Sequence, residues 1–501
     1  MTHTSPWHKP AQPAAFGPLR AQRSVDVAVI GAGITGLTTA LLAQRNGARV
    51  AVIEAESVAS GTTGRTTGKV TSQHGEIYGR LTRRHGQDVA RLYGAANEAA
   101  VGLVAELVSD LDIQCGFARA AAFTYTTDPQ SVQRLQEEAE TARRLGLPSE
   151  FVTETDLPFP VAGAVRFDNQ AYFDAARYCG ALANEVVAGG GEVYEQSRAL
   201  RVEWERSPVV VRTPEGAVAA DHVVVATLLP VIDIGGFFAK TRPKRSYGIA
   251  VRLADNAPAS MAISVESPKR STRPWPAGGP NGLIVVGDGH ETGHEQDTQR
   301  HYDALEGWTR DVFGEASVHF RWSAQDYSTL DELPYVGRSP RTTHCYVATG
   351  FNKWGLSNGT AAAMVLAELI NGRESPWLRA FDATRIGDAA AVVKMAKENV
   401  HVGKQFVSDR VARLTADSVR DLAAGSGRIV RAGGRAVAAY RDADGTVHAV
   451  DATCTHMGCT VRFNDAERSW DCPCHGSRFA TNGDVLAGPA VRPLSEVDVE
   501  H

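Results

Sequence analysis

Two short runs near the end of the chain concentrate residue types that bind metals. The run CTHMGC begins at Cys454, and the run CPCHGS begins at Cys472. They hold four of the seven cysteines of the protein and include His456 and His475. Cys454, His456, Cys472 and His475 can thus supply two thiolates and two imidazoles. This donor set suits an iron–sulfur centre and also a tetrahedral zinc ion.

The arrangement of these ligands resembles the cluster loops of Rieske proteins from respiratory and photosynthetic cytochrome complexes. One loop reads Cys-x-His and the other Cys-x-x-His, whereas zinc fingers usually keep their two cysteines together and their two histidines together. The resemblance covers residues 416–501 and implies a small all-β domain that binds a [2Fe–2S] cluster through those four residues. It also implies a disulfide between Cys459 and Cys474, and a covering loop in the segment GPAVRPL.

One position departs from the high-potential members of that family. They carry a tyrosine two residues after the serine of HGS, and its hydroxyl bonds a ligand sulfur, but HGSRF places Phe479 there. Ser477 keeps its own potential hydrogen bond to the cluster. Because hydrogen bonds to sulfur favour the reduced state, we expect a potential in the middle of the range of roughly −150 to +300 mV.

The head of the chain predicts a dinucleotide site. The segment VDVAVIGAGITGLTTALLAQRNGARVAVIEAE reads as a strand, a glycine turn, a helix and a second strand. Gly31 allows the tight turn, Gly33 lets the backbone approach a pyrophosphate, and Gly36 lets the helix pack closely on the strand. Glu54 ends the second strand, where its carboxylate can accept hydrogen bonds from ribose hydroxyls. This motif by itself does not separate FAD from NAD.

Further motifs resemble the D-amino-acid-oxidase-like superfamily of FAD-dependent oxidoreductases. The matching segments, in the expected order, are GAGITG, IEAE, SGTTGRTTG, VVVATLLP, LPYVGR and ATGFNKWGLSNG. The resemblance covers residues 24–385 and implies FAD across the fold, with the flavin ring near residues 350–357. It implies an α/β fold, in which a Rossmann-like FAD-binding domain is interleaved with an α+β substrate domain built on an antiparallel sheet.

The resemblance also sets the expected domain boundaries and cofactor contacts. FAD-binding segments are expected at about 24–75, 166–239 and 331–385, and substrate segments at about 76–165 and 240–330. The residues expected to contact FAD are Gly31, Gly33, Ile34, Thr35, Gly36, Glu54, Ala55, Thr63, Arg65, Thr66, Thr67, Ala199, Ala226, Thr227, Gly350, Asn352, Lys353, Gly355 and Leu356. Some relatives attach flavin covalently through a histidine where this chain has Arg65, or through a cysteine before LPYVG where it has none. We therefore expect non-covalent FAD.

Candidate catalytic residues lie mainly in the GFNKWG turn. In this superfamily, hydride leaves the carbon of a neutral amine, so no strong general base is required, and orientation matters more. Asn352, Lys353 and Trp354 are the first candidates, with Lys353 able to stabilise charge at the flavin or to bind a substrate carboxylate. His74 and Tyr247 are further catalytic candidates. Gln170 and Arg338 belong to the same weaker group, and all four of these residues are more easily explained by packing or surface pairing.

The remaining segments complete the predicted organisation. Residues 1–23 are expected to be an N-terminal arm. Residues 386–415 have no proline and repeat apolar side chains, which favours a helical linker rather than a flexible tether.

Composition excludes several classes of function. The formal charge of −5 argues against a nucleic-acid partner, and no apolar run is long enough for a membrane span or typical of a secretory signal. Three cysteines scattered singly through the first 350 residues fit reduced thiols, so we expect a cytoplasmic protein.

The two cofactors together suggest a converter between two-electron and one-electron chemistry. The main hypothesis is oxidation of a C–N bond in a small amine or amino acid, with electrons passing from flavin to the Rieske cluster and on to a one-electron acceptor, a protein or a quinone. One alternative is an oxidase that uses O2 and has a structural or regulatory cluster. Another is an electron-transfer component that serves a separate oxygenase.

Overall fold

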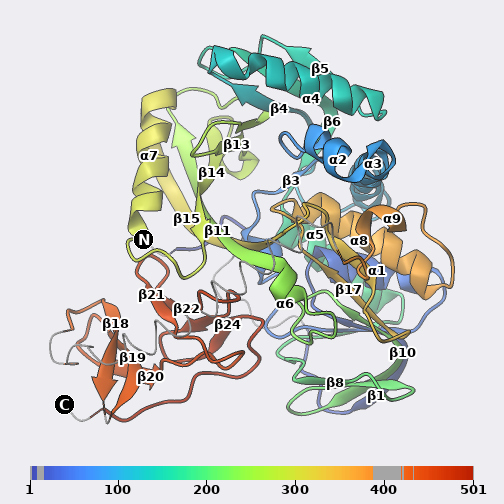
Figure 1. The fold of residues 1–501 in the computed structure, drawn as a ribbon, viewed down its shortest axis with the longest axis vertical. Helices are drawn as coiled ribbons and strands as arrows, with labels where there is room; N and C mark the ends of the chain where they lie inside the picture. Colours follow the sequence, from blue (N-terminus) through green and yellow to red (C-terminus); the bar gives the residue numbers. More distant parts are fainter. Residues whose placement is uncertain (1–2, 8–15, 387–418, 420–421, 433, 500–501) are drawn as a thin grey trace.

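The computed structural model describes residues 3–7, 16–386, 419, 422–432 and 434–499 (Figure 1). Two large sheets with their helices form the first 386 residues, and a smaller β-domain follows near the C-terminus. The predicted helical linker at 386–415 lies outside the described residues except for its first position. None of the described helices combines the length and the apolar character that crossing a membrane requires.

The first sheet is mostly parallel and contains the predicted nucleotide-binding strands. Its main path runs β16-β17-β10-β1-β2-β7, and β8 and β9 extend it beside β10. The bounds are β1 Gln22–Ile30, β2 Val50–Ile53, β7 Glu192–Tyr194, β8 Arg201–Glu203, β9 Val209–Arg212, β10 Ala217–Val225, β16 Tyr335–Arg338 and β17 Cys345–Thr349. Val27 to Ile30 are all buried, as expected for a parallel strand covered on both faces.

The second sheet is mostly antiparallel and follows the order β15-β11-β14-β13-β12-β4-β6-β3, with β5 beside β6. The bounds are β3 Lys69–Val70, β4 Ala118–Thr126, β5 Ser149–Val152, β6 Gly163–Tyr172, β11 Thr241–Leu253, β12 Met261–Ser264, β13 Arg270–Pro274, β14 Gly282–Glu291 and β15 Ala316–Thr329. Only β4 and β12 pair in parallel among the described strands of this sheet.

Helices cover both sheets. Their bounds are α1 Ile34–Arg45, α2 Tyr78–His85, α3 Gln87–Asp110, α4 Val132–Arg144, α5 Ala175–Ala188, α6 Phe237–Lys240, α7 Gln299–Phe313, α8 Gly355–Ile370 and α9 Leu378–Phe381. The helices α1, α5 and α8 lie beside the first sheet, while α7 packs along β11, β14 and β15 of the second (Figure 1).

The predicted interleaving of the two halves is confirmed. The segment order in the chain alternates between the sheets, because β1 and β2 precede β4, and β10 precedes β11. Two strands fall on the other side of the predicted boundaries at about 75 and 166. The sequence predicts β3 and most of β6 in the FAD-binding part, but both strands pair within the second sheet.

The C-terminal domain consists of antiparallel strands, as predicted. It has one sheet of order β18-β19-β20 and a second of order β21-β22-β23-β24. The bounds are β18 Gly427–Ala432, β19 Arg435–Arg441, β20 Val447–Asp451, β21 Arg462–Asn464, β22 Ser469–Asp471, β23 Arg478–Ala480 and β24 Val485–Ala487. CTHMGC therefore lies in the connection from β20 to β21, which joins the two sheets, and CPCHGS lies in the hairpin connection between β22 and β23.

This domain packs directly against the second sheet and α6 (Figure 1). Gln325 of β15 donates from Nε2 to the Gly476 carbonyl at 2.7 Å, and Thr298 beside α7 donates from its backbone N–H to the Asp465 carboxylate at 2.8 Å. The N-terminal arm also joins the body of the protein. Trp7 is buried and its indole N–H donates to the Thr66 carbonyl at 2.7 Å.

Candidate active site and metal centre

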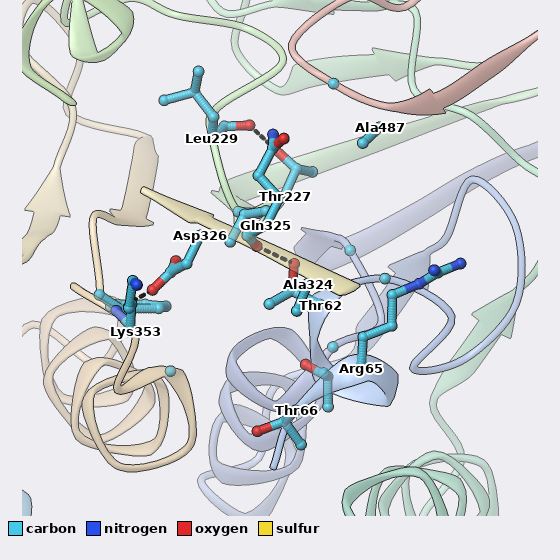
Figure 2. Close-up of a pocket in the computed structure, with 18 of the residues that line it drawn as sticks. Thr62, Arg65, Thr66, Thr227, Leu229, Ala324, Gln325, Asp326, Lys353 and Ala487 are labelled. Atoms are coloured by element: carbon cyan, nitrogen blue, oxygen red, sulfur yellow. Dashed lines mark hydrogen bonds between the residues drawn. The ribbon is translucent and has the colours of Figure 1, made fainter. Parts of the chain in front are cut away.

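One continuous cavity of about 1700 Å³ connects the two halves and the C-terminal domain. Its walls include the glycine turn at the end of β1, the face of the second sheet, and the turn before α8. Residues 484–488 of the C-terminal domain close another side, and Figure 2 shows Ala487 of that segment facing the same space as Thr227. A long dinucleotide therefore has room between the two sheets.

The glycine turn at one end of the cavity has the geometry that a bound pyrophosphate requires. Gly31 has φ +106°, and a Cβ there would lie 2.6 Å from the Ala226 carbonyl oxygen. A Cβ at Gly36 would lie only 1.9 Å from the Gly31 oxygen, so α1 can pack this closely on β1 only with glycine. Gly33 lines the cavity directly before α1, where the positive end of the helix dipole favours an anion.

Glu54 lies beside this turn, as the sequence predicts. Its carboxylate accepts the backbone N–H groups of Ala32 at 2.8 Å and of Glu56 at 3.0 Å, which fixes its orientation at the cavity wall. Burial raises the pKa of Glu54, although those hydrogen bonds oppose the shift. The fixed carboxylate fits a role as acceptor for ribose hydroxyls.

The Thr- and Gly-rich loop forms the next part of the wall. Thr62 donates from its hydroxyl to the Gln325 carbonyl at 2.8 Å, which joins the loop to β15. The Arg65 side chain lines the cavity and forms no ion pair with any carboxylate of the described residues. Figure 2 shows β15 crossing the view between Arg65 and Lys353. A cation that forms no ion pair among the described residues and a preformed glycine turn together fit the diphosphate of FAD.

The GFNKWG turn lies at the other end of the cavity and is held by its own side chains. Asn352 accepts the Thr329 N–H at 2.9 Å and donates to the Glu332 and Gly350 carbonyls, each at 3.1 Å. Asn352 and Lys353 have φ of +53° and +72°. The Lys353 N–H donates to the carboxylate of Asp326 on β15 (Figure 2). Asn352 thus shapes the turn, while the Lys353 side chain points into the cavity.

His74 and Trp354 form an aromatic wall of the cavity. Their rings stack at 4.6 Å with an interplanar angle of 17°. The two ring nitrogens of His74 contact the Tyr93 hydroxyl at 2.6 Å and, on the other side, the Thr71 carbonyl at 2.8 Å and Ser357 hydroxyl at 2.9 Å. Burial lowers the pKa of His74 to about 3, so the imidazole is neutral at pH 7. Its geometry suits positioning of Trp354 rather than proton donation.

The other predicted residues divide between the cavity and the surrounding structure. Tyr247 lines the cavity, and its hydroxyl lies 3.0 Å from His290 Nε2. Burial raises the pKa of Tyr247 to about 12, so the phenol keeps its proton. Gln170 lies outside the cavity lining and accepts the Ser72 N–H at 2.7 Å, and Arg338 is exposed at the end of β16.

Most of the predicted FAD contacts lie on one surface. Those that line the cavity are Gly31, Gly33, Ile34, Thr35, Glu54, Ala55, Thr63, Arg65, Thr66, Thr67, Ala199, Ala226, Thr227, Asn352, Lys353, Gly355 and Leu356. Gly36 and Gly350 are not part of the lining. Gly350 instead lets the turn pass close to β15, because a Cβ there would lie 2.3 Å from Thr329 Cγ2.

The four predicted metal ligands meet at the facing tips of the two C-terminal loops. Cys454 and Cys472 are buried, and a hydrogen bond from the Cys472 thiol lowers the pKa of Cys454 to about 7. The rings of His456 and His475 lie 5.1 Å apart, edge to face. Nδ1 of His475 is buried and has no partner among the described residues. Two adjacent thiols and a buried, unpartnered imidazole nitrogen fit an iron–sulfur cluster.

The disulfide implied by the Rieske resemblance is present between Cys459 and Cys474. It joins the two loops behind the cluster ligands. The sulfurs of this pair and of Cys472 lie within 4.8 Å of one another, because the disulfide packs against Cys472. The disulfide therefore fits a role as support beside the four predicted ligands.

Several residues of the first domain contact this centre, and sequence reasoning missed them. The Phe238 ring lies edge-on to the rings of His475 at 5.0 Å and His456 at 5.7 Å. The Tyr327 hydroxyl donates to the His475 carbonyl at 2.9 Å. No sequence signal could pair these residues with the loops, because more than 140 positions separate Tyr327 from His475.

Comparison with known proteins agrees with this geometry. The family model described as FAD dependent oxidoreductase, labelled DAO, matches residues 26–369, and the Rieske [2Fe–2S] domain model matches residues 412–498. The chain is 34% identical to the protein YhfW of Bacillus subtilis (strain 168), whose name describes a Rieske 2Fe-2S iron-sulfur protein. That similarity covers 99% of this chain and 97% of YhfW.

Two further proteins resemble the first domain. The gamma-glutamylputrescine oxidoreductase of Escherichia coli (strain K12) is 26% identical over 74% of this chain and 89% of its own length. The crystal structure of glycine oxidase from Geobacillus kaustophilus superimposes with a TM-score of 0.63 at 20% identity. It covers 72% of this chain and 99% of the oxidase, which shows a shared fold.

Proposed function

This chain belongs to the DAO family of FAD-dependent oxidoreductases and carries a Rieske [2Fe–2S] domain, and from this premise we propose that it oxidises a C–N bond of an amine or amino acid and passes the electrons through the cluster to a one-electron acceptor. FAD supplies a two-electron acceptor for hydride, and the [2Fe–2S] cluster supplies a one-electron carrier. We propose that the FAD is held without a covalent bond, since Arg65 stands where a covalent histidine would be needed.

One observation carries the proposed transfer between the centres. Three consecutive residues of β15 contact both sites. Asp326 accepts the N–H of Lys353 in the turn at the ring end of the cavity, while its neighbours Gln325 and Tyr327 donate to the loop of the cluster ligand His475. A single rigid strand therefore holds the two sites in a fixed relation, which a one-electron transfer inside the chain requires.

The residues at the ring end can bind and orient a substrate without proton transfer. The His74–Trp354 stack supplies a flat neutral wall, and Lys353 supplies a positive charge whose Nζ donates to the Ser246 hydroxyl at 2.9 Å. Trp354 and the segment 484–488 form two further parts of the cavity wall. An amine held in its neutral form against this wall needs no general base, which agrees with the neutral, hydrogen-bonded state of His74.

The direct test is anaerobic reduction of the purified protein with a panel of amines and amino acids. Bleaching of the flavin absorbance reports oxidation of the substrate, and the EPR signal of the reduced cluster in the same sample reports internal transfer. We expect both signals with the same compounds. Bleaching without cluster reduction would contradict the transfer.

A ligand variant separates the proposal from its alternatives. Cys454→Ala removes one cluster ligand and leaves the Cys459–Cys474 disulfide intact. It should abolish reduction of an external one-electron acceptor while flavin bleaching persists. Stoichiometric peroxide at an unchanged rate in this variant would support an oxidase instead. Slow bleaching with every amine, together with rapid reduction of a protein partner, would support an electron-transfer component.

A further inference from the structure

The chain places its few lysines together at one end of the cavity. Only nine of its 52 lysine and arginine residues are lysines, and five of those nine lie in the part of the chain that the structure describes. Four of these five line the cavity, namely Lys69, Lys244, Lys269 and Lys353. A lysine ammonium is a compact charge on a flexible stem, and it can follow a small anion. Because arginine provides most other cations of the chain, this concentration points to a specific use.

The lysines reach the cavity from separate elements. Lys244 and Ser246 lie on the same face of β11, because side chains alternate along a strand. Lys353 lies in the turn before α8, and its Nζ donates to Ser246. Lys269 directly precedes β13, where its exposed side chain forms part of the mouth of the cavity. Three ammonium groups therefore surround one region from three directions.

Lys69 has a structural role and is not part of this group. Its ammonium donates to the Ala262 and Thr272 carbonyls and to the Ser271 hydroxyl, which uses all three of its hydrogens. Burial then lowers the pKa of Lys69 to about 7. It joins β3 to β12 and β13 and has no donor left for a ligand.

Neighbouring carboxylates do not neutralise the other three lysines. The carboxylates on the adjacent elements are already bound to arginines, in the pairs Glu332–Arg80 at 2.8 Å, Glu291–Arg242 at 3.3 Å and Glu76–Arg134 at 2.5 Å. No carboxylate of the described residues forms an ion pair with Lys244, Lys269 or Lys353.

One further carboxylate faces the group. Asp326 lies opposite Lys244 in the pairing of β11 with β15, and it accepts the Lys353 N–H. Burial raises its pKa to about 6, so it carries a negative charge at pH 7. Three ammonium groups and one carboxylate leave an excess of two positive charges at this end of the cavity.

The effect of this excess is visible in Lys353. Its side chain lines the cavity, where the surrounding protein partly desolvates the ammonium group. That desolvation, together with the positive charges of Lys244 and Lys269, lowers the pKa of Lys353 to about 8, although Asp326 opposes the shift. Like charges held together without a counterion are unfavourable, and an anion between them would relieve the repulsion.

We infer that Lys244, Lys269 and Lys353 form the binding site for a substrate that carries two carboxylates beside its amine. Two carboxylates match the excess of two positive charges, whereas one would leave an ammonium unpaired. The inference rests on the proposed function, because it names the substrate class of the same cavity. It selects acidic amino acids or amines with two carboxylate arms over simple alkylamines.

The binding test uses two inert probes of the same shape and different charge. Succinate carries two carboxylates, and succinamate replaces one of them by an amide. Their dissociation constants for the purified FAD-loaded protein at pH 7 are measured from the perturbation of the flavin spectrum. We expect succinate to bind at least tenfold more tightly, the difference made by about one charge-assisted hydrogen bond. Equal affinities would overturn the inference.

Variants then identify the side chains. Lys244→Met and Lys269→Met keep the length of the stem and remove its charge. Each variant should weaken the binding of succinate by about tenfold, so that its dissociation constant approaches that of succinamate. Arg144→Gln removes a charge from the exposed face of α4 and should leave both constants unchanged. An unchanged succinate affinity in both lysine variants, with the FAD content retained, would also overturn the inference.

The outcomes separate this inference from the proposed function. If no amine bleaches the flavin but the lysine-dependent preference for succinate over succinamate persists, the proposed C–N oxidation fails and the dicarboxylate site stands. The opposite outcome is also informative. If glutamine and asparagine bleach the flavin as fast as glutamate and aspartate, and the protein binds succinate and succinamate equally well, the proposed oxidation stands and the dicarboxylate site fails.

Discussion

Two regions of the protein bury or enclose charge in opposite ways. At the contact between the first domain and the C-terminal domain, each buried cation has a carboxylate partner. Arg478 contacts Asp471 at 2.8 Å, and Arg245 of β11 contacts Glu467 at 3.5 Å. At the end of the cavity that holds the GFNKWG turn, only a short distance along β11, Lys244, Lys269 and Lys353 form no ion pair with a carboxylate of the described residues.

The difference separates charges that hold the structure from charges that await a ligand. Removing one member of a buried pair leaves an uncompensated charge, so such a pair fixes how two surfaces meet. Cations that line a cavity without an ion-pair partner cost stability and persist where binding requires them. One strand, β11, contributes to both, because Arg245 and Lys244 point to opposite faces of the sheet.

The largest expected effect is on the free energy of unfolding, after removal of one member of a buried ion pair. Arg478→Met leaves the buried Asp471 without its cation and should lower the free energy of unfolding of the C-terminal domain by about 3–5 kcal/mol. Denaturant unfolding followed by loss of the cluster absorbance measures this. The exposed pair of Arg144 and Glu140 provides the control, since Arg144→Met should cost less than about 1 kcal/mol. Equal effects in the two variants would remove the distinction between the regions.

A single hydrogen bond tests the link between the domains. Tyr327→Phe removes the donor to the His475 carbonyl and should cost about 1 kcal/mol of stability. Because this carbonyl belongs to the predicted cluster ligand His475, the reduction potential measured by EPR-monitored titration should also shift. Phe479→Tyr, which restores the family residue inside the C-terminal domain, should raise that potential. An unchanged reduction potential in Tyr327→Phe would show that this tyrosine contributes to packing and does not influence the cluster.

Removing one of the unpaired lysines should change the free energy of unfolding in the opposite direction. Lys244→Met removes one of three mutually repelling charges and should leave the free energy of unfolding unchanged or raise it by up to about 1 kcal/mol, while succinate affinity falls. Thermal unfolding of the apo- and FAD-loaded protein measures the first quantity. A loss of several kcal/mol would show that Lys244 supports the fold as Arg478 does.

The smallest effects come from pH, and the two regions should respond at opposite ends of the scale. Burial alone would raise the pKa of Asp471, but the charges of Arg478 and Arg245 hold it below its usual value of 3.8. The unfolded chain therefore binds more protons near that pH. The resulting stability is present above the unfolded pKa and is lost as pH falls through the folded one. Unfolding midpoints at decreasing pH measure this loss.

Above pH 7 the expected pH effect comes from Lys353 in the cavity. The folded pKa of Lys353 is about 8 and its unfolded value is 10.5. Between these values the unfolded chain holds more protons, so stability rises with pH, while succinate affinity falls above about pH 8 as the ammonium loses its proton. Lys353→Met should flatten the affinity profile between pH 7 and 9. A profile that stays unchanged in this variant would exclude Lys353 as the titrating group.

Much of the fold and of both cofactor sites was predictable from the sequence, because the motifs concerned are local. The glycines from Gly31 to Gly36 act through backbone geometry within one turn, and Cys454 and His456 share a loop of six residues. The boundaries of the interleaved domains were harder to predict from the sequence. β3 is only two residues long, and its place in the second sheet depends on pairing with β6, about 100 positions away.

The chain alone determined which cofactors the protein binds, since glycine turns and Cys/His loops carry their chemistry in adjacent residues. Only the tertiary structure decided which cations remain unpaired and which strand links the two centres. Lys244, Lys269 and Lys353 have no shared spacing, and Tyr327 reaches the cluster loop from another domain. Their roles arise from burial and charge balance, which are properties of the assembled surface and have no local pattern.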